Sequence, residues 1–99
     1  MVKRIEYSKE KDEWLRKKRN ISFQDVIEKI EKGEIISDQP HPNKERYSNQ
    51  RIYVLFLNNY VYVVPYIETE KKIFLKTVYP NRKFTKQYLK GGKNEKEKI

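Results

Sequence analysis

A chain of 99 residues can form one small domain with a single core, and its lack of cysteine excludes a disulfide framework and any thiolate metal site. Its single histidine argues against a histidine-rich zinc site, and its longest nearly apolar stretch is too short to span a membrane. The formal net charge is +9 and no signal peptide is visible, so we expect a cytoplasmic protein without metal or cofactor.

The N-terminal part of the chain predicts a short edge strand and a first helix. Residues 4–7 are the strand candidate, and Ser8 is placed to cap a helix over residues 9–19. Asn20 ends this helix, because asparagine accepts the left-handed conformation of a C-terminal cap. The helix has few apolar residues, so we expect Trp14 to be a packing anchor rather than a residue that stacks on bases.

The second predicted helix, residues 22–32, has the clearest local signal. Its serine N-cap and Asp25 approximate a capping box, and Gly33 ends it. One apolar stripe recurs at helical spacing: Phe23, Val26, Ile27 and Ile30. Residues 37–50 then read as a loop, in which His41 lies exposed between two prolines.

The richest β pattern lies over residues 51–67, where two runs of Val, Ile, Tyr and Phe flank Asn58-Asn59. Asparagine tolerates the positive φ of a tight turn, so we expect a hairpin. Its predicted cross-strand pairs are Leu57–Tyr60, Leu55–Tyr62, Tyr53–Val64 and Arg51–Tyr66. Alternation gives this hairpin an aliphatic face and a tyrosine face, and we expect the second helix to pack on the aliphatic one, at Val54 and Val63.

A third strand, residues 72–79, completes a meander, and two registers are open to it. An odd-numbered loop or a bulge after Glu68 places Ile73 and Leu75 on the aliphatic face and Lys76 among the tyrosines. An even loop pushes lysines into the core. We favour the odd loop, because burying an unpaired ammonium is costly.

Asn81 can cap a last short helix that reaches Leu89, and residues 90–99 have nothing to bury. The sequence therefore predicts a single α+β domain over residues 1–89 and a charged mobile tail over residues 90–99. The expected architecture is a small antiparallel sheet, a three- to four-stranded meander, with two N-terminal helices packed on one face and a short C-terminal helix.

The cations gather in two parts of the chain. Residues 71–90 hold seven cations and no acid, and a second cluster covers residues 16–19. Clustered cations beside aromatic side chains are typical of a nucleic-acid surface. A solvated lysine-rich surface explains the charge equally well, so both interpretations stay open.

Several short motifs follow one another in an order and spacing that match a known family. They are Glu6-Tyr7-Ser8 with Lys11, then Lys18-Arg19-Asn20-Ile21-Ser22-Phe23, then Glu45-Arg46-Tyr47, and a basic C-terminal stretch that ends in Tyr88. Together these residues resemble the BrnT-type toxins. Arg19 and Asn20 stand where that family commonly has His and Gly, and Tyr79-Pro80-Asn81-Arg82 replaces its usual Ser-Ala-Arg.

The resemblance implies a RelE-like fold and the activity of a ribonuclease toxin in a type II toxin–antitoxin pair, acting on RNA without a metal. It also implies a cognate antitoxin, commonly a ribbon-helix-helix DNA-binding protein. It is compatible with a homodimer within the toxin–antitoxin complex and implies no membrane partner. The alternative function is that of a non-catalytic basic module that binds nucleic acid.

Metal-free RNA cleavage needs cations that stabilise negative charge on the phosphoryl oxygens and groups that transfer protons. Candidates for the first task are Arg46, Lys76 and Arg82, and for the second His41, Glu45 and Tyr88. Further candidate RNA contacts are Lys72, Lys83 and Lys86, with Tyr53 and Tyr62 as base-stacking rings. The tyrosine face has two other interpretations, as a surface covered by the antitoxin or by a second copy of the chain.

Overall fold

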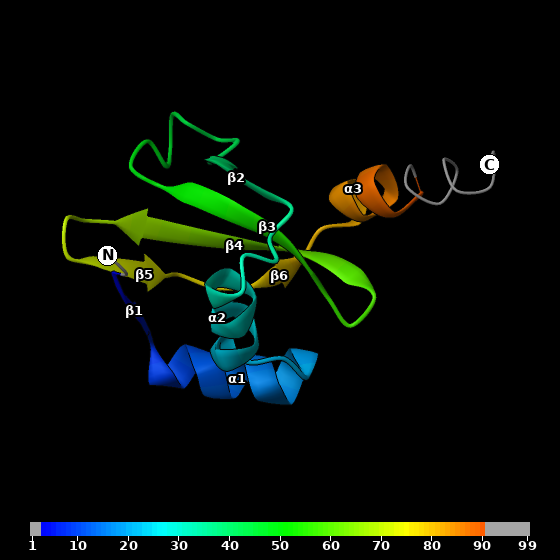
Figure 1. Cartoon of the computed structure of the whole chain (residues 1–99), viewed down its shortest axis with the longest axis horizontal. Helices are drawn as coiled ribbons and strands as arrows, with labels where there is room; N and C mark the ends of the chain where they lie inside the picture. Colours follow the sequence, from blue (N-terminus) through cyan, green and yellow to red (C-terminus); the bar gives the residue numbers. More distant parts are fainter. Residues whose placement is uncertain (1–2, 91–99) are drawn as a thin grey trace.

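The computed structural model describes residues 3–90, so most of the predicted tail, residues 91–99, lies outside the described part. Its strands are β1 (Arg4–Tyr7), β2 (Ser37–Pro40), β3 (Arg51–Leu57), β4 (Tyr60–Glu68), β5 (Lys72–Leu75) and β6 (Tyr79–Pro80). Its helices are α1 (Lys9–Arg19), α2 (Phe23–Glu31), α3 (Arg82–Thr85) and the π-helical turn η1 (Lys86–Lys90). Figure 1 shows α1 and α2 together on one side of the sheet and α3 at its far end.

The strands form one mixed sheet in the order β1-β5-β4-β3-β2, and β6 pairs with β4. The predicted meander of β3, β4 and β5 is confirmed, with β2 added antiparallel to β3. β1 runs parallel to β5, so the α+β class is confirmed but the expected all-antiparallel sheet is wrong at this edge. A parallel pair needs a long crossover, and the chain supplies one because both helices and three strands separate β1 from β5.

The β3–β4 hairpin has the predicted register, with Arg51 opposite Tyr66 at its open end. At its closed end Asn58 and Asn59 have φ angles of 50° and 64°. Both angles lie in the left-handed region that a two-residue hairpin turn requires. The hairpin could be predicted because its register follows from the turn and the alternation alone.

α1 and α2 pack on the tyrosine face of the hairpin, so the prediction that α2 covers the aliphatic face is wrong. The core on this side, which we call the α1–α2 face, combines Leu15, Ile21, Phe23 and Val26 with Tyr53, Leu55, Leu57, Tyr62, Val64, Tyr66, Leu75 and Val78. A tyrosine ring buries more apolar area than a valine, and it can be buried when its hydroxyl finds a partner. The hydroxyl of Tyr66 does so, donating to Asp38 Oδ1 at 2.6 Å.

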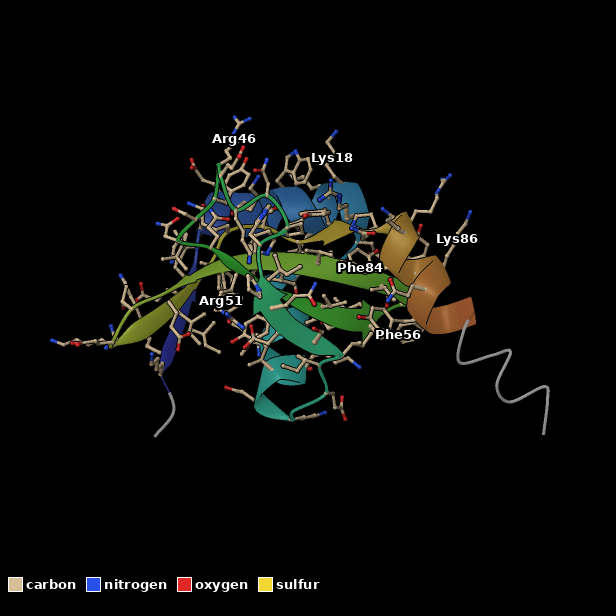
Figure 2. The ribbon with its side chains drawn as sticks, turned by 90° about the horizontal axis from the view of Figure 1, so that it is seen from above. Lys18, Arg46, Arg51, Phe56, Phe84 and Lys86 are labelled. Atoms are coloured by element: carbon tan, nitrogen blue, oxygen red, sulfur yellow. The ribbon has the colours of Figure 1, made fainter. Side chains whose placement is uncertain are left out.

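The aliphatic face is buried as well, beneath the C-terminal helix. This side, which we call the α3 face, contains Ile52, Val54, Val61 and Val63, with Phe56, Tyr79, Phe84 and Tyr88 packed against them. Phe84 and Tyr88 of the C-terminal helix therefore face the sheet. Figure 2 shows Phe56 and Phe84 near each other beside α3.

β5 has the register that the sequence analysis disfavoured. Leu75 lies opposite Tyr66 and Ile73 opposite Glu68, so Leu75 and Ile73 join the α1–α2 face. Lys76 consequently lies on the α3 face. It remains exposed there, because the aromatic residues of α3 and η1 cover the hairpin end of that face rather than this edge.

A β-bulge separates β5 from β6. Residues 64–65 of β4 lie opposite residues 76–78, one residue more, between the Tyr66–Leu75 and Val63–Tyr79 pairs. The extra residue lets Val78 enter the core of the α1–α2 face while Tyr79 returns to the α3 face. The bulge therefore places Tyr79 and Lys76 on the same face.

The predicted helix ends are confirmed. The Ser8 side chain accepts from the N–H of Lys11, Asn20 caps α1 with a φ of 56°, and the capping box of α2 is complete. Gly33 follows α2 with a φ of 72°. These signals are local, so they need no knowledge of the tertiary structure.

Two expectations about the N-terminal half are wrong. Trp14 is 41% exposed, because α1 turns Leu15 rather than its neighbour toward the core. Residues 37–40 form β2 instead of a loop, since backbone pairing with β3 does not require apolar side chains. No helix within residues 3–90 is long and apolar enough to cross a membrane.

Candidate nucleic-acid interface

The α3 face joins predicted site residues from opposite edges of the sheet. Pairing aligns Ile52, Pro65 and Lys76 in one row, in which the N–H of Lys76 donates to Pro65 O at 2.8 Å. The next row begins at His41, whose N–H donates to Gln50 O at 3.1 Å. His41 and Lys76 thus share a face but stand about 15 Å apart, three strand spacings. That backbone separation favours binding of two different phosphates over binding of one.

The loop between β2 and β3 brings His41 and Arg46 together around one aromatic ring. The His41 ring lies 4.4 Å from the ring of Tyr47, and the guanidinium of Arg46 lies 5.7 Å from it on the exposed side of the loop. His41 Nδ1 accepts from the N–H of Asn43 at 3.0 Å. The proton of a neutral His41 is therefore on Nε2, which is free to act as a donor.

Tyr79 connects this loop to the β6 edge. Its side chain is half-buried on the α3 face, and burial together with the neighbouring Tyr47 raises the pKa of its hydroxyl. Sequence reasoning assigned no role to Tyr47 or Tyr79, although Tyr47 belongs to a motif of the family resemblance and Tyr79 to the segment that departs from it.

The C-terminal helix carries exposed cations on the side away from the sheet. Arg82, Lys83 and Lys86 are exposed, and Figure 2 shows Lys86 projecting outward beside α3, at a different end of the molecule from Arg46. Tyr88 is half-buried, with its ring 5.9 Å from that of Phe84. Packing explains the position of Tyr88 without a catalytic role.

Tyr53 and Tyr62 are 6% and 9% exposed beneath the helices. Tyr53 stacks on Tyr66 with ring centroids 4.2 Å apart, and burial raises the pKa of its hydroxyl. Their predicted role in base stacking is therefore wrong. The same packing removes the tyrosine face as a surface for an antitoxin or a second copy.

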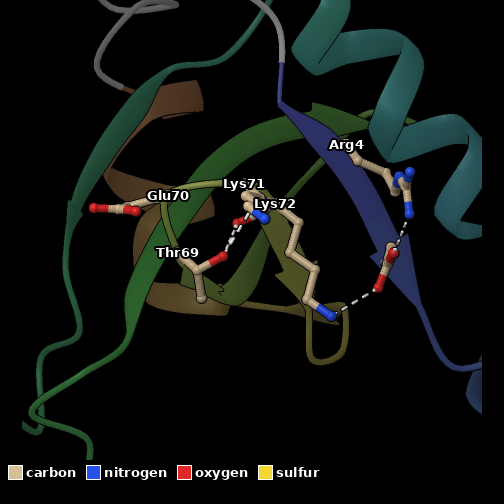
Figure 3. A pocket seen from close by; sticks show the side chains of 6 residues that line it. Arg4, Thr69, Glu70, Lys71 and Lys72 are labelled. Carbon is tan, nitrogen blue, oxygen red and sulfur yellow. Dashed lines mark hydrogen bonds and ion pairs between the residues drawn. The ribbon is translucent and has the colours of Figure 1, made fainter.

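Lys72 lies at the opposite edge of the sheet from the β2–β3 loop and is engaged in an ion pair. Its Nζ is 3.1 Å from Glu6 Oε1, and this contact lowers the pKa of the Glu6 carboxyl. Lys72 and Arg4, both labelled in Figure 3, line a pocket of about 820 Å³, and both contact Glu6. An RNA phosphate would have to compete with Glu6 for Lys72.

A second polar cluster, on the α1–α2 face, was missed by the sequence analysis. Tyr66, Arg51 and Asp38 form it, with Arg51 Nε 3.2 Å from both Asp38 Oδ1 and the Tyr66 hydroxyl. The Arg51–Tyr66 pairing could be predicted from the hairpin register. The position of Asp38 could not, because it depends on β2, which was predicted to be a loop. Among residues 3–90, no three His, Asp or Glu side chains gather in a group that could hold a metal ion.

The candidate interface thus consists of the exposed cations around the α3 face together with the half-buried Tyr47 and Tyr79. Comparisons with curated proteins and with solved structures found no match to the chain. A family model described as a domain of unknown function, DUF4258, matches residues 13–80, which is more than half of the chain. The protein therefore belongs to the DUF4258 family.

Proposed function

We propose that this protein is a metal-independent endoribonuclease with a RelE-like arrangement, acting as the toxin of a type II toxin–antitoxin pair. The observation that carries the proposal is that the β2–β3 loop, the segment after β5 and the C-terminal helix, which all adjoin the α3 face, each expose cations: Arg46, Lys76, Arg82, Lys83 and Lys86. Residues 71–90 contain no acid that would repel a phosphate backbone. The resemblance to BrnT-type toxins supplies the reaction.

In that reaction the ribose 2′-OH attacks the adjacent phosphorus and the bond to the 5′-oxygen breaks. The products are a 2′,3′-cyclic phosphate and a 5′-hydroxyl. The protein has to stabilise the extra negative charge on the phosphoryl oxygens, take a proton from the 2′-OH and give one to the leaving oxygen.

The loop supplies the most coherent set of groups for these tasks. Arg46 presents a planar guanidinium suited to two phosphoryl oxygens, and the nearby Nε2 of His41 has the proton for the leaving oxygen. Glu45, next to Arg46 and exposed, is the candidate base. Lys76 and Arg82 then bind phosphates of neighbouring nucleotides rather than the reacting one, because Lys76 is about 15 Å from His41.

The test is RNA cleavage by purified protein in EDTA, with analysis of the product ends. Arg46→Ala should lower the rate about 100-fold or more, as loss of a group that stabilises transition-state charge does. Arg46→Lys should recover only part of it, since lysine lacks the planar fork. Lys32→Ala, which removes an exposed cation at the end of α2, is the matched control and should leave the rate unchanged.

A well-folded protein that binds RNA but cleaves none, free or on ribosomes, would refute the nuclease. The second candidate, a non-catalytic module that binds nucleic acid, would then stand. One observation favours it: Tyr88 is packed against Phe84, with ring centroids 5.9 Å apart, which accounts for its position without catalysis. This candidate predicts that Arg46→Ala costs no more than one phosphate contact and that binding weakens steeply with salt.

A further inference from the structure

Trp14 is the largest side chain that the described fold leaves exposed. It is the single tryptophan of the chain, and 41% of its surface is accessible. The other large exposed hydrophobic residue within residues 3–90 is Ile36, at 39%. Isolated exposed apolar residues are ordinary, so exposure by itself assigns Trp14 no role.

The surroundings of Trp14 distinguish it. The Nζ of Lys11 lies 5.1 Å from the centre of its ring, and the guanidinium carbon of Arg19 lies 4.8 Å from it. Arg19 is fixed in turn, because its guanidinium donates to Val78 O at 2.6 Å. Arg19 therefore links the ring of Trp14 to the bulge between β5 and β6.

That position joins Trp14 to the candidate interface. Val78 lies between Lys76 and Tyr79 in the chain. The Arg19–Val78 contact therefore brings the C-terminal end of α1 to the edge of the α3 face that carries Lys76, which we call the cationic edge. The last turn of α1 consists of four cations, residues 16–19, and Figure 2 shows Lys18 and Arg46 pointing to the same side of the molecule.

The chemistry around the ring selects one class of ligand. Ammonium and guanidinium groups border the ring of Trp14, and the last turn of α1 adds further cations, so this surface favours an anionic ligand. An aromatic platform with cations on its borders suits a single-stranded nucleic acid, whose bases stack on the ring while its phosphates bind the cations.

We propose that Trp14 is a base-stacking platform for single-stranded RNA, at the end of a track that runs from α1 past Arg19 to Lys76. A base takes the place of the Lys11 ammonium at the ring, and Lys11 turns to a phosphate. Arg19 keeps the indole in position through Val78. This inference rests on the proposed function only for the identity of the substrate as RNA.

The single tryptophan permits a direct test in which cleavage plays no part. The probe is a short single-stranded oligonucleotide with deoxyribose, which lacks the 2′-OH that cleavage requires. Adding it to the full-length protein should quench the tryptophan fluorescence in a saturable manner, because quenching reports contact between a base and the indole. Fluorescence anisotropy of a labelled copy measures the affinity independently.

Trp14→Ala should weaken the affinity about 5- to 150-fold, the range expected for one lost base stack, and Trp14→Phe should restore part of it. Ile36→Ala, at the other exposed apolar residue, is the matched control and should bind like the wild type. Binding without quenching, wild-type affinity in Trp14→Ala, or no binding at all would each overturn the inference. Quenching in a protein that cuts no RNA would preserve the platform and refute only the nuclease.

Discussion

The hydroxyl of Tyr66 links three neighbouring strands. It donates to Asp38 on β2 at 2.6 Å and accepts from Arg51 on β3 at 3.2 Å, while its ring stacks on Tyr53. Because Tyr66 is 1% exposed, its hydroxyl has to be paired within the protein. One side chain thus supplies both apolar area to the core and the polar contact that holds β2 to the sheet.

Tyr66→Phe should destabilise the protein by about 1 kcal/mol at neutral pH, the usual net value of a hydrogen bond, since Arg51 and Asp38 still bind each other. Urea unfolding measures this change. Tyr60→Phe, at a partly exposed tyrosine near the hairpin turn, is the control and should have a smaller effect.

The same substitution should change the alkaline limb of the stability curve. Burial, and next to it the hydrogen bond to Asp38, raises the pKa of Tyr66 above its usual value. Above pH ~10 the unfolded chain loses this proton while the folded protein keeps it, so stability falls as pH rises. Below that pH the contribution of Tyr66 to stability does not change with pH. The fall should be shallower in Tyr66→Phe, and an unchanged slope would contradict the assignment.

At the scale of residues, the chemical type of a side chain could be used to choose site candidates, but the burial of that side chain could not be predicted from the sequence. Arg46, Arg82 and Lys86 are exposed cations, as binding to phosphate requires. Tyr53 and Trp14 were assigned the reverse of what the structure shows. The alternation of the strand identifies which side chains share a face with Tyr53, but not what covers that face.

At the scale of elements, Asp12 ties the two N-terminal helices together. Its Oδ1 accepts from the N–H of Phe23 at 2.8 Å, and its Oδ2 pairs with Arg16 at 3.0 Å. Phe23 is the first residue of α2, where an N–H has no partner within its own helix. Asp12 of α1 therefore helps to cap α2 from outside and sets the angle between the two helices.

Asp12→Ala should lower the free energy of unfolding by about 2–3 kcal/mol, because the N–H of Phe23 is left buried without a partner. Asp12→Asn keeps an acceptor oxygen and should lose less. Arg16→Ala is the matched control: it breaks only the partly exposed ion pair and should have the smallest effect. Equal losses in Asp12→Ala and Arg16→Ala, measured by urea unfolding, would show that the ion pair rather than the cap matters.

The elements that could be predicted are those defined by local signals. Caps ended α1 and α2 at the right residues, and the Asn58-Asn59 turn gave the register of the hairpin. The choice between the two faces of the hairpin depends on helices far away in the chain, so it was wrong. The predicted register of β5 was also wrong, because it assumed that the aliphatic face is covered along its whole length, whereas Lys76 stays exposed on that face.

At the scale of the whole molecule, the cations are distributed so that one surface can serve two ligands. Under the proposed function, RNA and an antitoxin both need the cationic edge, and the packing of α1 and α2 leaves the antitoxin no access to Tyr53 or Tyr62. The antitoxin should therefore neutralise the toxin through the edge formed by Lys76 and α3, where an acidic segment finds cations without competing acids.

This arrangement predicts that Lys76→Glu combined with Arg82→Glu weakens a complex with the protein encoded by the neighbouring gene, and that the difference shrinks as salt is added, since salt screens exposed charges. The control, Lys9→Glu with Lys32→Glu, changes the net charge equally at exposed ends of α1 and α2, so a local contact predicts little loss from it. A pull-down at several salt concentrations compares the two pairs, and co-expression shows whether growth is relieved. Equal weakening by both pairs would mean that the partner senses only the total charge of +9. Stable binding by both would place the antitoxin elsewhere, and the cationic edge would then be left to RNA alone.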